Sequence, residues 1–115
     1  MIVRTVPGFP GYSASDDGHI YSTRPWRGSS EQRELAGGVN ARGYRQVILC
    51  NAGTRTVREV HAIVAATFHG PRPEGMDTRH LDGDKTNNAA SNLRYGTRSE
   101  NELDKVRHRR MRRAA

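Results

Sequence analysis

The alternation of apolar and polar residues begins with a short predicted hairpin. The runs Tyr12–Ser15 and His19–Ser22 have β-type patterning and flank Asp16-Asp17-Gly18, whose residue types favour a tight turn. Residues 24–42, by contrast, are interrupted by glycine, proline and serine. We expect a loop there, with at most a short strand.

A second hairpin is the clearest local feature of the chain. Tyr44–Cys50 and Thr54–Val60 are rich in β-forming residues and are separated by Asn51-Ala52-Gly53, which contains a suitable turn glycine. From residue 60 to residue 68 the apolar positions then recur at helical spacing. A short buried helix should therefore follow the second hairpin and end before Pro71.

The remaining pattern predicts a strand, a long polar loop, a second strand and a helix. Ser99 is a suitable N-cap for this helix because Glu102 lies three residues later, as in a capping box. The predicted elements are the strand Met76–Leu81, the loop Asp82–Ser91, the strand Asn92–Gly96 and a helix from Glu100 to about Arg110.

Composition narrows the class of protein. A chain of 115 residues with 34% hydrophobic residues, 12 glycines and 5 prolines has room for one domain with a thin core, which favours an open binding surface over an enclosed cavity. The lone Cys50 excludes an internal disulfide and a multi-cysteine zinc site. No stretch approaches the roughly 20 apolar residues of a membrane span, and the N-terminus lacks a signal-peptide pattern. We therefore expect a soluble, cytoplasmic protein with no membrane partner.

The positive charge is concentrated at the C-terminus. The formal net charge is +7, and all 12 acidic residues precede Lys105, so the preceding part of the chain is close to neutral. Such segregated charge is typical of a chain that binds a polyanion, and nucleic acid is favoured over membrane because the segment contains few large apolar residues. A disordered, solubilising tail is the alternative. The candidate DNA-binding residues are Lys105, Arg107, Arg109, Arg110, Arg112 and Arg113.

The most specific motif is RHLDGDKTNNAASNLRYGTRSENELDKVRH, at residues 79–108. It resembles the HNH endonucleases, and most closely those of the phage homing-endonuclease type, through His80, Asn92 and Asn101 at the family's spacing. The segments GFPGYSASDDGHIYS and VHAIVAATFHGPRPEGM resemble the parts that precede this motif, so the likeness covers about residues 6–108.

The resemblance implies an α+β fold with N-terminal β-hairpins followed by a ββα-metal (HNH) nuclease motif. In that motif two antiparallel strands and a helix surround one divalent cation. We accordingly expect three parts: an N-terminal β-hairpin module that contacts DNA (1–58), the nuclease motif (59–108) and a basic tail (109–115).

The same resemblance implies metal-dependent hydrolysis of a phosphodiester bond. A neutral imidazole suits His80 as the general base that activates water. Asn92 could hold the other ring nitrogen or fix the backbone of the polar loop. Asn101 offers a hard oxygen to Mg²⁺ or Mn²⁺, the cofactors that we expect.

Arg79 departs from the family pattern, in which Asp or His often precedes the catalytic His and binds the metal. A guanidinium cannot bind a cation, so we expect Asp104, one helical turn after Asn101, to be the second ligand; Asp77 or Asp82 is the alternative. Arg79 itself would then clamp a phosphate oxygen. The other interpretation is that Arg79 marks a relative that has lost catalysis.

Two nearby features have plainer interpretations. His61, in VHAIV, is expected to pack or hydrogen-bond within the core. The stretch from Asp82 to Asn88 is rich in Asp and Asn, but it lacks the closing Glu of a calcium loop. We expect Asp84, Asn87 and Asn88 to staple the loop by side-chain hydrogen bonds to the backbone.

Two functions remain in competition. The first is a DNA endonuclease that nicks or cuts double-stranded DNA, acting as a monomer or a homodimer. The second is a catalytically inactive DNA-binding module with the same fold. Neither the recognition sequence nor the number of strands cut can be deduced from the residues.

Overall fold

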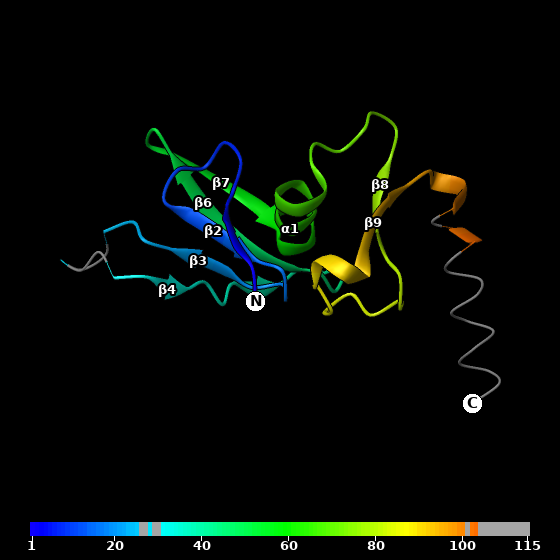
Figure 1. Ribbon diagram of the computed structural model, residues 1–115, viewed down its shortest axis with the longest axis horizontal. Helices are drawn as coiled ribbons and strands as arrows, with labels where there is room; N and C mark the ends of the chain where they lie inside the picture. The colour runs from blue at the N-terminus through cyan, green and yellow to red at the C-terminus, as the bar shows by residue number, and fades with distance from the viewer. Residues whose placement is uncertain (26–27, 29–30, 101, 104–115) are drawn as a thin grey trace.

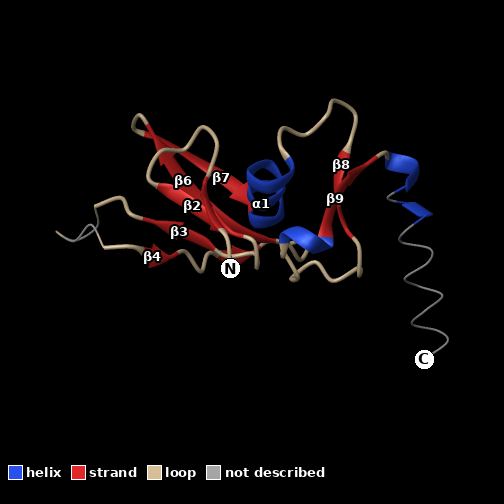
Figure 2. Cartoon of the chain, in the orientation of Figure 1, coloured by secondary structure: helices blue, strands red, loops and turns tan. Residues whose placement is uncertain are grey.

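The computed structural model describes residues 1–25, 28, 31–100 and 102–103. Within these ranges the chain forms three antiparallel sheets and the helix α1 (Val60–His69). In Figure 1, α1 lies between the two N-terminal sheets and the hairpin β8–β9, and Figure 2 shows the same arrangement coloured by secondary structure. The predicted α+β class, with N-terminal hairpins preceding the nuclease region, is confirmed.

The first sheet has the strand order β1-β2-β3-β4. The predicted hairpin is present as β2 (Tyr12–Ser15) and β3 (Ile20–Ser22), with Tyr12 opposite Ser22. Its outer strand β1 (Val3–Thr5) was not predicted, because it is short and lacks an alternating pattern. The other outer strand, β4 (Arg33–Glu34), lies in the stretch 24–42, where we expected at most a short strand.

The second sheet has the order β5-β6-β7 and contains the predicted long hairpin. Ala52 and Gly53 have φ values of 52° and 81°, so both turn residues adopt the left-handed conformation that matches the twist of a two-residue hairpin. On β6, Val47 and Leu49 point into the core, whereas Ile48 is exposed. The strands are β5 (Gly38–Val39), β6 (Arg45–Asn51) and β7 (Thr54–Glu59).

Helix α1 holds the two halves of the chain together. It buries Val60, Ile63 and Val64 and contacts strands of both N-terminal sheets as well as β8 and β9. The buried cluster includes Val6 from the N-terminus and Leu93 from β9. One core therefore spans the predicted boundary at residue 58, and the three-part division stays a prediction.

The third sheet consists of β8 (Asp77–His80) and β9 (Leu93–Gly96), with His80 opposite Leu93. The loop between them ends in the short 3₁₀ helix η1 (Ala90–Asn92). Residues 98–100 and 102–103 are helical. Among the described residues, no helix has the length and apolar character needed to cross a membrane.

The start of the last helix differs from the prediction. The N–H and hydroxyl groups of Thr97 donate to Oε1 of Glu100, at 3.2 and 3.1 Å, and the N–H of Glu100 donates to the Thr97 hydroxyl at 3.2 Å. Thr97 and Glu100 therefore form the capping box, two residues earlier than the predicted pair of Ser99 and Glu102. The prediction that Ser99 caps the helix was wrong, and Ser99 lies within its first turn.

Candidate active site

His80 is the last residue of β8 and stands where that strand opens into the polar loop. Its Nε2 atom lies 3.0 Å from Oδ1 of Asn88, a buried residue that is only 5% exposed. An amide oxygen can only accept a hydrogen bond, so Nε2 carries the proton in this arrangement. When the ring is neutral, the lone pair then resides on Nδ1, which is the arrangement that a general base requires.

The Asn92 side chain hydrogen-bonds to both ends of the polar loop and not to the His80 ring. Its Oδ1 accepts the N–H of Asp82 at 3.1 Å, and its Nδ2 donates to Asp82 Oδ1 and to the carbonyl of Asn87, both at 2.9 Å. Of the two alternatives for Asn92, this geometry corresponds to fixing the loop backbone.

Asp82 is the acceptor at the centre of the same loop. Burial raises the pKa of its carboxyl group, but hydrogen bonds from the Asn87 side chain, the Asp84 N–H and the Asn92 side chain outweigh this effect, and the pKa lies below its ordinary value. Asn87 Nδ2 occupies Oδ2 at 2.8 Å, while Oδ1 accepts from Asn92 and Asp84. Both oxygens are therefore engaged within the loop.

Two aromatic rings form the wall behind His80. Tyr44 is stacked on the imidazole, with ring centroids 5.9 Å apart and an interplanar angle of 27°. His61, on α1, meets the same imidazole edge to face at 5.0 Å and contacts Tyr44 at 4.8 Å. His61 is packed in the interior as predicted, with 13% of its side chain exposed. The rings that it packs against, however, are those of His80 and Tyr44 in the site.

Two cations lie over Tyr44. The Nζ atom of Lys85 is 5.0 Å, and the guanidinium carbon of Arg42 is 5.4 Å, from the centre of the tyrosine ring. Lys85 also donates to the carbonyl of Arg42 at 2.9 Å, and its side chain lies against Gly43. Lys85 thus fastens the polar loop to the segment before β6 and adds positive charge beside the base.

The Arg79 side chain contacts the last helix and packs over β9. Its guanidinium forms an ion pair with Glu100 at 3.4 Å, and its aliphatic part lies over Gly96, where an added Cβ would come within 2.2 Å of Arg79 Cδ. Only 16% of the Arg79 side chain is exposed. The first turn of the last helix is consequently held against β8.

An open groove of about 790 Å³ continues from this wall along α1 and the hairpin. Tyr44 and His61 line one end, and the arginines at 58, 72 and 98 line its sides together with Asp77. The lining therefore combines arginines with the acidic residues Glu59, Asp77 and Glu102.

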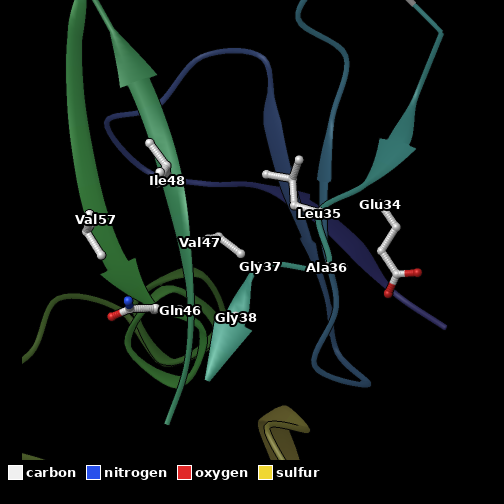
Figure 3. Close-up of a pocket in the computed structure, with 9 residues that line it drawn as sticks. All are labelled: Glu34, Leu35, Ala36, Gly37, Gly38, Gln46, Val47, Ile48 and Val57. Carbon is white, nitrogen blue, oxygen red and sulfur yellow. The ribbon is translucent and has the colours of Figure 1, made fainter. Parts of the chain in front are cut away.

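A second pocket, of about 450 Å³, lies elsewhere (Figure 3). Leu35 lies on one side, while Val47, Ile48 and Val57 lie on β6 and β7. Its lining is aliphatic apart from Glu34 and Gln46 and contains none of the predicted catalytic residues.

The structure brings some of the predicted residues together. His80, Asn92 and Arg79 all lie at one end of the β8–β9 hairpin or beside it. Asn88 was expected only to staple the loop, yet its side chain contacts the base. No local signal separates it from the other asparagines. Outside the described residues lie the predicted ligands Asn101 and Asp104 and the predicted DNA-binding residues Lys105, Arg107, Arg109, Arg110, Arg112 and Arg113.

The residues that the structure describes do not by themselves form a metal centre. Among them, no group of three or more His, Cys, Asp or Glu side chains is placed to hold an ion. Both carboxylate oxygens of Asp82 already accept hydrogen bonds from other residues of the loop. The Arg79–Glu100 contact does place the start of the helix beside β8, and Asn101 follows Glu100 directly in sequence.

Comparison with known proteins identifies the class of this site. Residues 58–103 match the HNH endonuclease family. Through that region the chain is similar to the HNH endonucleases, a family whose members typically depend on a metal.

The chain is homologous to a particular phage enzyme. It is 30% identical over 99 residues to DNA endonuclease I-HmuI of Bacillus phage SP01, covering 85% of this chain and 53% of that protein. A solved structure describing DNA binding and cleavage by the HNH homing endonuclease I-HmuI superposes with a TM-score of 0.78 at 28% identity, over 92% of this chain and 58% of the other. The chain thus spans about half the length of that relative.

Proposed function

We propose that the protein is a metal-dependent DNA endonuclease in which His80 activates the water that attacks a phosphodiester bond. The observation that carries this proposal is the 3.0 Å contact between His80 Nε2 and Asn88 Oδ1. Because it leaves the lone pair on Nδ1, the imidazole is ready to accept a proton from water. The similarity to I-HmuI supports DNA as the substrate.

The residues of the chain divide the work between proton transfer and charge neutralisation. Nδ1 of His80 takes the proton as the water oxygen attacks phosphorus, and Asn88 keeps its contact with Nε2 while the ring becomes an imidazolium. The P–O bond to the leaving sugar oxygen breaks as the new bond forms, and that oxygen takes its proton from solvent. Asn92 and Asp82 keep the loop that carries Asn88 in place. Arg79 would leave Glu100 to bind a phosphate oxygen, since an arginine fork matches that group.

One divalent cation, Mg²⁺ or Mn²⁺, is proposed as the cofactor, with Asn101 and Asp104 as its protein ligands and water completing its shell. When bound, it would neutralise negative charge on the phosphate and the leaving oxygen. Replacing Asn101 by Ala should therefore raise the Mg²⁺ concentration needed for half-maximal cleavage.

Double-stranded DNA is the proposed partner. Lys85 and Arg42 lie over Tyr44, which stacks on His80, and further arginines line the groove. The six basic residues from Lys105 to Arg113 add positive charge along the sequence. A single site per chain favours nicking by a monomer, with double-strand cutting only if two chains pair.

The deciding experiment is conversion of supercoiled plasmid to its open-circle or linear form with and without Mg²⁺. Replacing His80 by Ala should abolish conversion, because a general base typically contributes about 10²–10⁴-fold in rate, while DNA affinity stays nearly unchanged. Replacing His69, whose Nε2 lies 2.8 Å from the carbonyl oxygen of Ala90, is the matched control. Full activity of the His80→Ala protein would remove His80 from the mechanism.

The rival function is a DNA-binding module that has lost turnover, which the Arg79 substitution in the family pattern favours. Salt-sensitive DNA binding is expected under both functions and does not distinguish them. Plasmid that stays supercoiled with Mg²⁺ and Mn²⁺, at protein concentrations that saturate binding, would support the module.

A further inference from the structure

One pair of buried groups has no role in the mechanism above. Nδ1 of His61 and Oε2 of Glu59 are both shielded from solvent and make no hydrogen bond, although they lie 3.9 Å apart. Burying a polar atom without a hydrogen bond costs about 1–3 kcal/mol, so two such atoms side by side need an explanation. Their location supplies one, because the ring that bears Nδ1 packs on the catalytic imidazole.

We propose that His61 is a positioning residue for His80, whose edge-to-face contact fixes the plane of the catalytic imidazole. This proposal rests on the proposed function of His80. A hydrogen bond from Nε2 to Asn88 anchors one atom of the ring but leaves the ring free to swing about that anchor. Stacking on Tyr44 and the edge contact with His61 remove that freedom from two other directions.

The three restraints come from three separate segments of the chain. Asn88 belongs to the polar loop, Tyr44 to the segment before β6, and His61 to the first turn of α1. Several residues of α1 are buried in the core, so the position of His61 is fixed by core packing. The contact of His61 with His80 therefore restrains the imidazole relative to the core. Orientation of this kind is worth much in catalysis, because a misplacement of about 1 Å can cost about 10²-fold in rate.

His61 is also suited to this place by being uncharged. Burial, followed by electrostatic interaction with His80 and with Arg42, lowers the pKa of His61 to about 4. At neutral pH its contact with Glu59 is therefore not an ion pair. A neutral neighbour does not oppose the positive charge that His80 gains when it takes a proton from water.

Two substitutions separate ring shape from ring nitrogens. His61→Leu fills the space without a flat edge, and His61→Phe keeps the flat ring without nitrogens. His69→Leu is the matched control, since His69 lies on the same helix and bonds the carbonyl of Ala90 at 2.8 Å instead of meeting His80. DNA affinity and thermal unfolding are measured for all three, together with kcat.

We expect His61→Leu to lower kcat about 10- to 100-fold, with Kd for DNA within twofold of the parent. Both His61 variants remove an unsatisfied buried nitrogen, so neither should unfold at a lower temperature than the parent. His61→Phe should keep kcat within about threefold, because the edge contact survives. Equal loss in the Phe and Leu variants would overturn the positioning role, and so would a loss in His61→Leu that merely follows its unfolding temperature as in His69→Leu.

A measurement without DNA tests the same idea independently of cleavage. Long-range ¹H–¹⁵N NMR spectra report which ring nitrogen of a histidine carries the proton. The parent and His61→Phe should show one His80 tautomer, protonated on Nε2, whereas His61→Leu should show an average of two. An unchanged His80 spectrum in His61→Leu overturns the proposal even if every variant cuts DNA. If the parent fails to cut, the proposed function fails, while the NMR comparison still decides the positioning role.

Discussion

Glu100 reaches from the first turn of the last helix to Arg79 on β8, with Oε2 3.4 Å from the guanidinium Nη1. The same carboxylate caps that helix through its other oxygen, which accepts from Thr97. Arg79 stands directly opposite Arg94 in the hairpin, so Glu100 also offsets two facing like charges. One side chain therefore fixes the helix start and holds Arg79, which stands where the family resemblance led us to expect a metal ligand.

The contact makes the role of Arg79 testable. If Arg79 clamps a phosphate oxygen, Arg79→Ala should lower the cleavage rate at saturating metal about 10-fold or more. This is the effect expected for losing a hydrogen bond to a charged group. Arg94→Ala removes the same charge from the opposite position and should at most weaken DNA binding. Cleavage by Arg79→Ala at the parental rate would leave Arg79 as a structural partner of Glu100.

Restoring an acid at this position is a separate test. Arg79→Asp should tighten metal binding by adding a ligand, but it also places a second carboxylate near Glu100. The double variant Arg79→Asp, Glu100→Gln removes that repulsion and keeps a residue that can form the capping box. Mg²⁺ titrations of the cleavage rate should give half-saturation in the order double variant, single variant, parent, from lowest to highest. The reverse order would show that position 79 does not face the ion.

Asn88 should control the protonation of the base. In Asn88→Asp a carboxylate would accept the Nε2 proton and stabilise the charged imidazole. Because the neutral form is the active one, the acid limb of the pH–rate profile for kcat should move to higher pH. Asn88→Ala, which cannot hold Nε2, should lower kcat without that upward shift. An acid limb unmoved in Asn88→Asp would contradict the assigned contact.

Asn92 is expected to act through the loop. Replacing it by Ala removes three hydrogen bonds around Asp82 and Asn87 and should lower the free energy of unfolding by about 1–3 kcal/mol, measured by urea denaturation. Activity should fall as well, because the same loop carries Asn88. A variant that unfolds like the parent but does not cleave would indicate direct contact of Asn92 with substrate.

Asp82 gives the loop a defined dependence on pH. Its pKa is lower in the folded protein than in the unfolded chain, so its contribution to stability is present above the ordinary carboxyl pKa near 4 and is lost as pH falls below it. Asp82→Asn should be less stable than the parent at pH 7, and the difference should shrink by pH 3. A difference independent of pH would mean that the charge of Asp82 is not what the loop uses.

The basic tail gives a quantitative expectation for DNA binding. Each neutralised phosphate contributes about −0.9 to the slope of log K against log salt concentration. If most of the four arginines in residues 109–115 contact the DNA backbone, deleting this segment should flatten the slope by about 3 units. Cleavage at low salt should survive, because His80 and the proposed ligands precede the deletion. An unchanged slope would show that the tail does not contact DNA, and the contacts would then be expected at the groove arginines and Lys85.

Much of the fold follows from local pattern. The turn glycines at 18 and 53, the alternating strands around them and the helical spacing after residue 60 each express their structure within a few residues. His80 was likewise placed correctly at the end of a strand, because the HNH resemblance and the strand pattern agree there. These features are short-range, so the sequence alone determines them.

Choices between equivalent residues were decided by tertiary structure. Both Thr97 and Ser99 precede a glutamate by three residues, and the earlier pair is selected where Glu100 also meets Arg79 on another element. Asn88 and Asn92 lie in one asparagine-rich loop, and only its folded path brings Asn88 rather than Asn92 to the imidazole.

The wall of the site depends still more on the whole fold. His61 is 19 positions and Tyr44 is 36 positions before His80 in the sequence, and neither belongs to the strand–loop–strand motif. They meet His80 because α1 packs between β6, β7 and the β8–β9 hairpin in one core. Packing of this kind depends on burial shared by distant segments, which no single stretch of sequence encodes, so only the tertiary structure could bring these rings to the base.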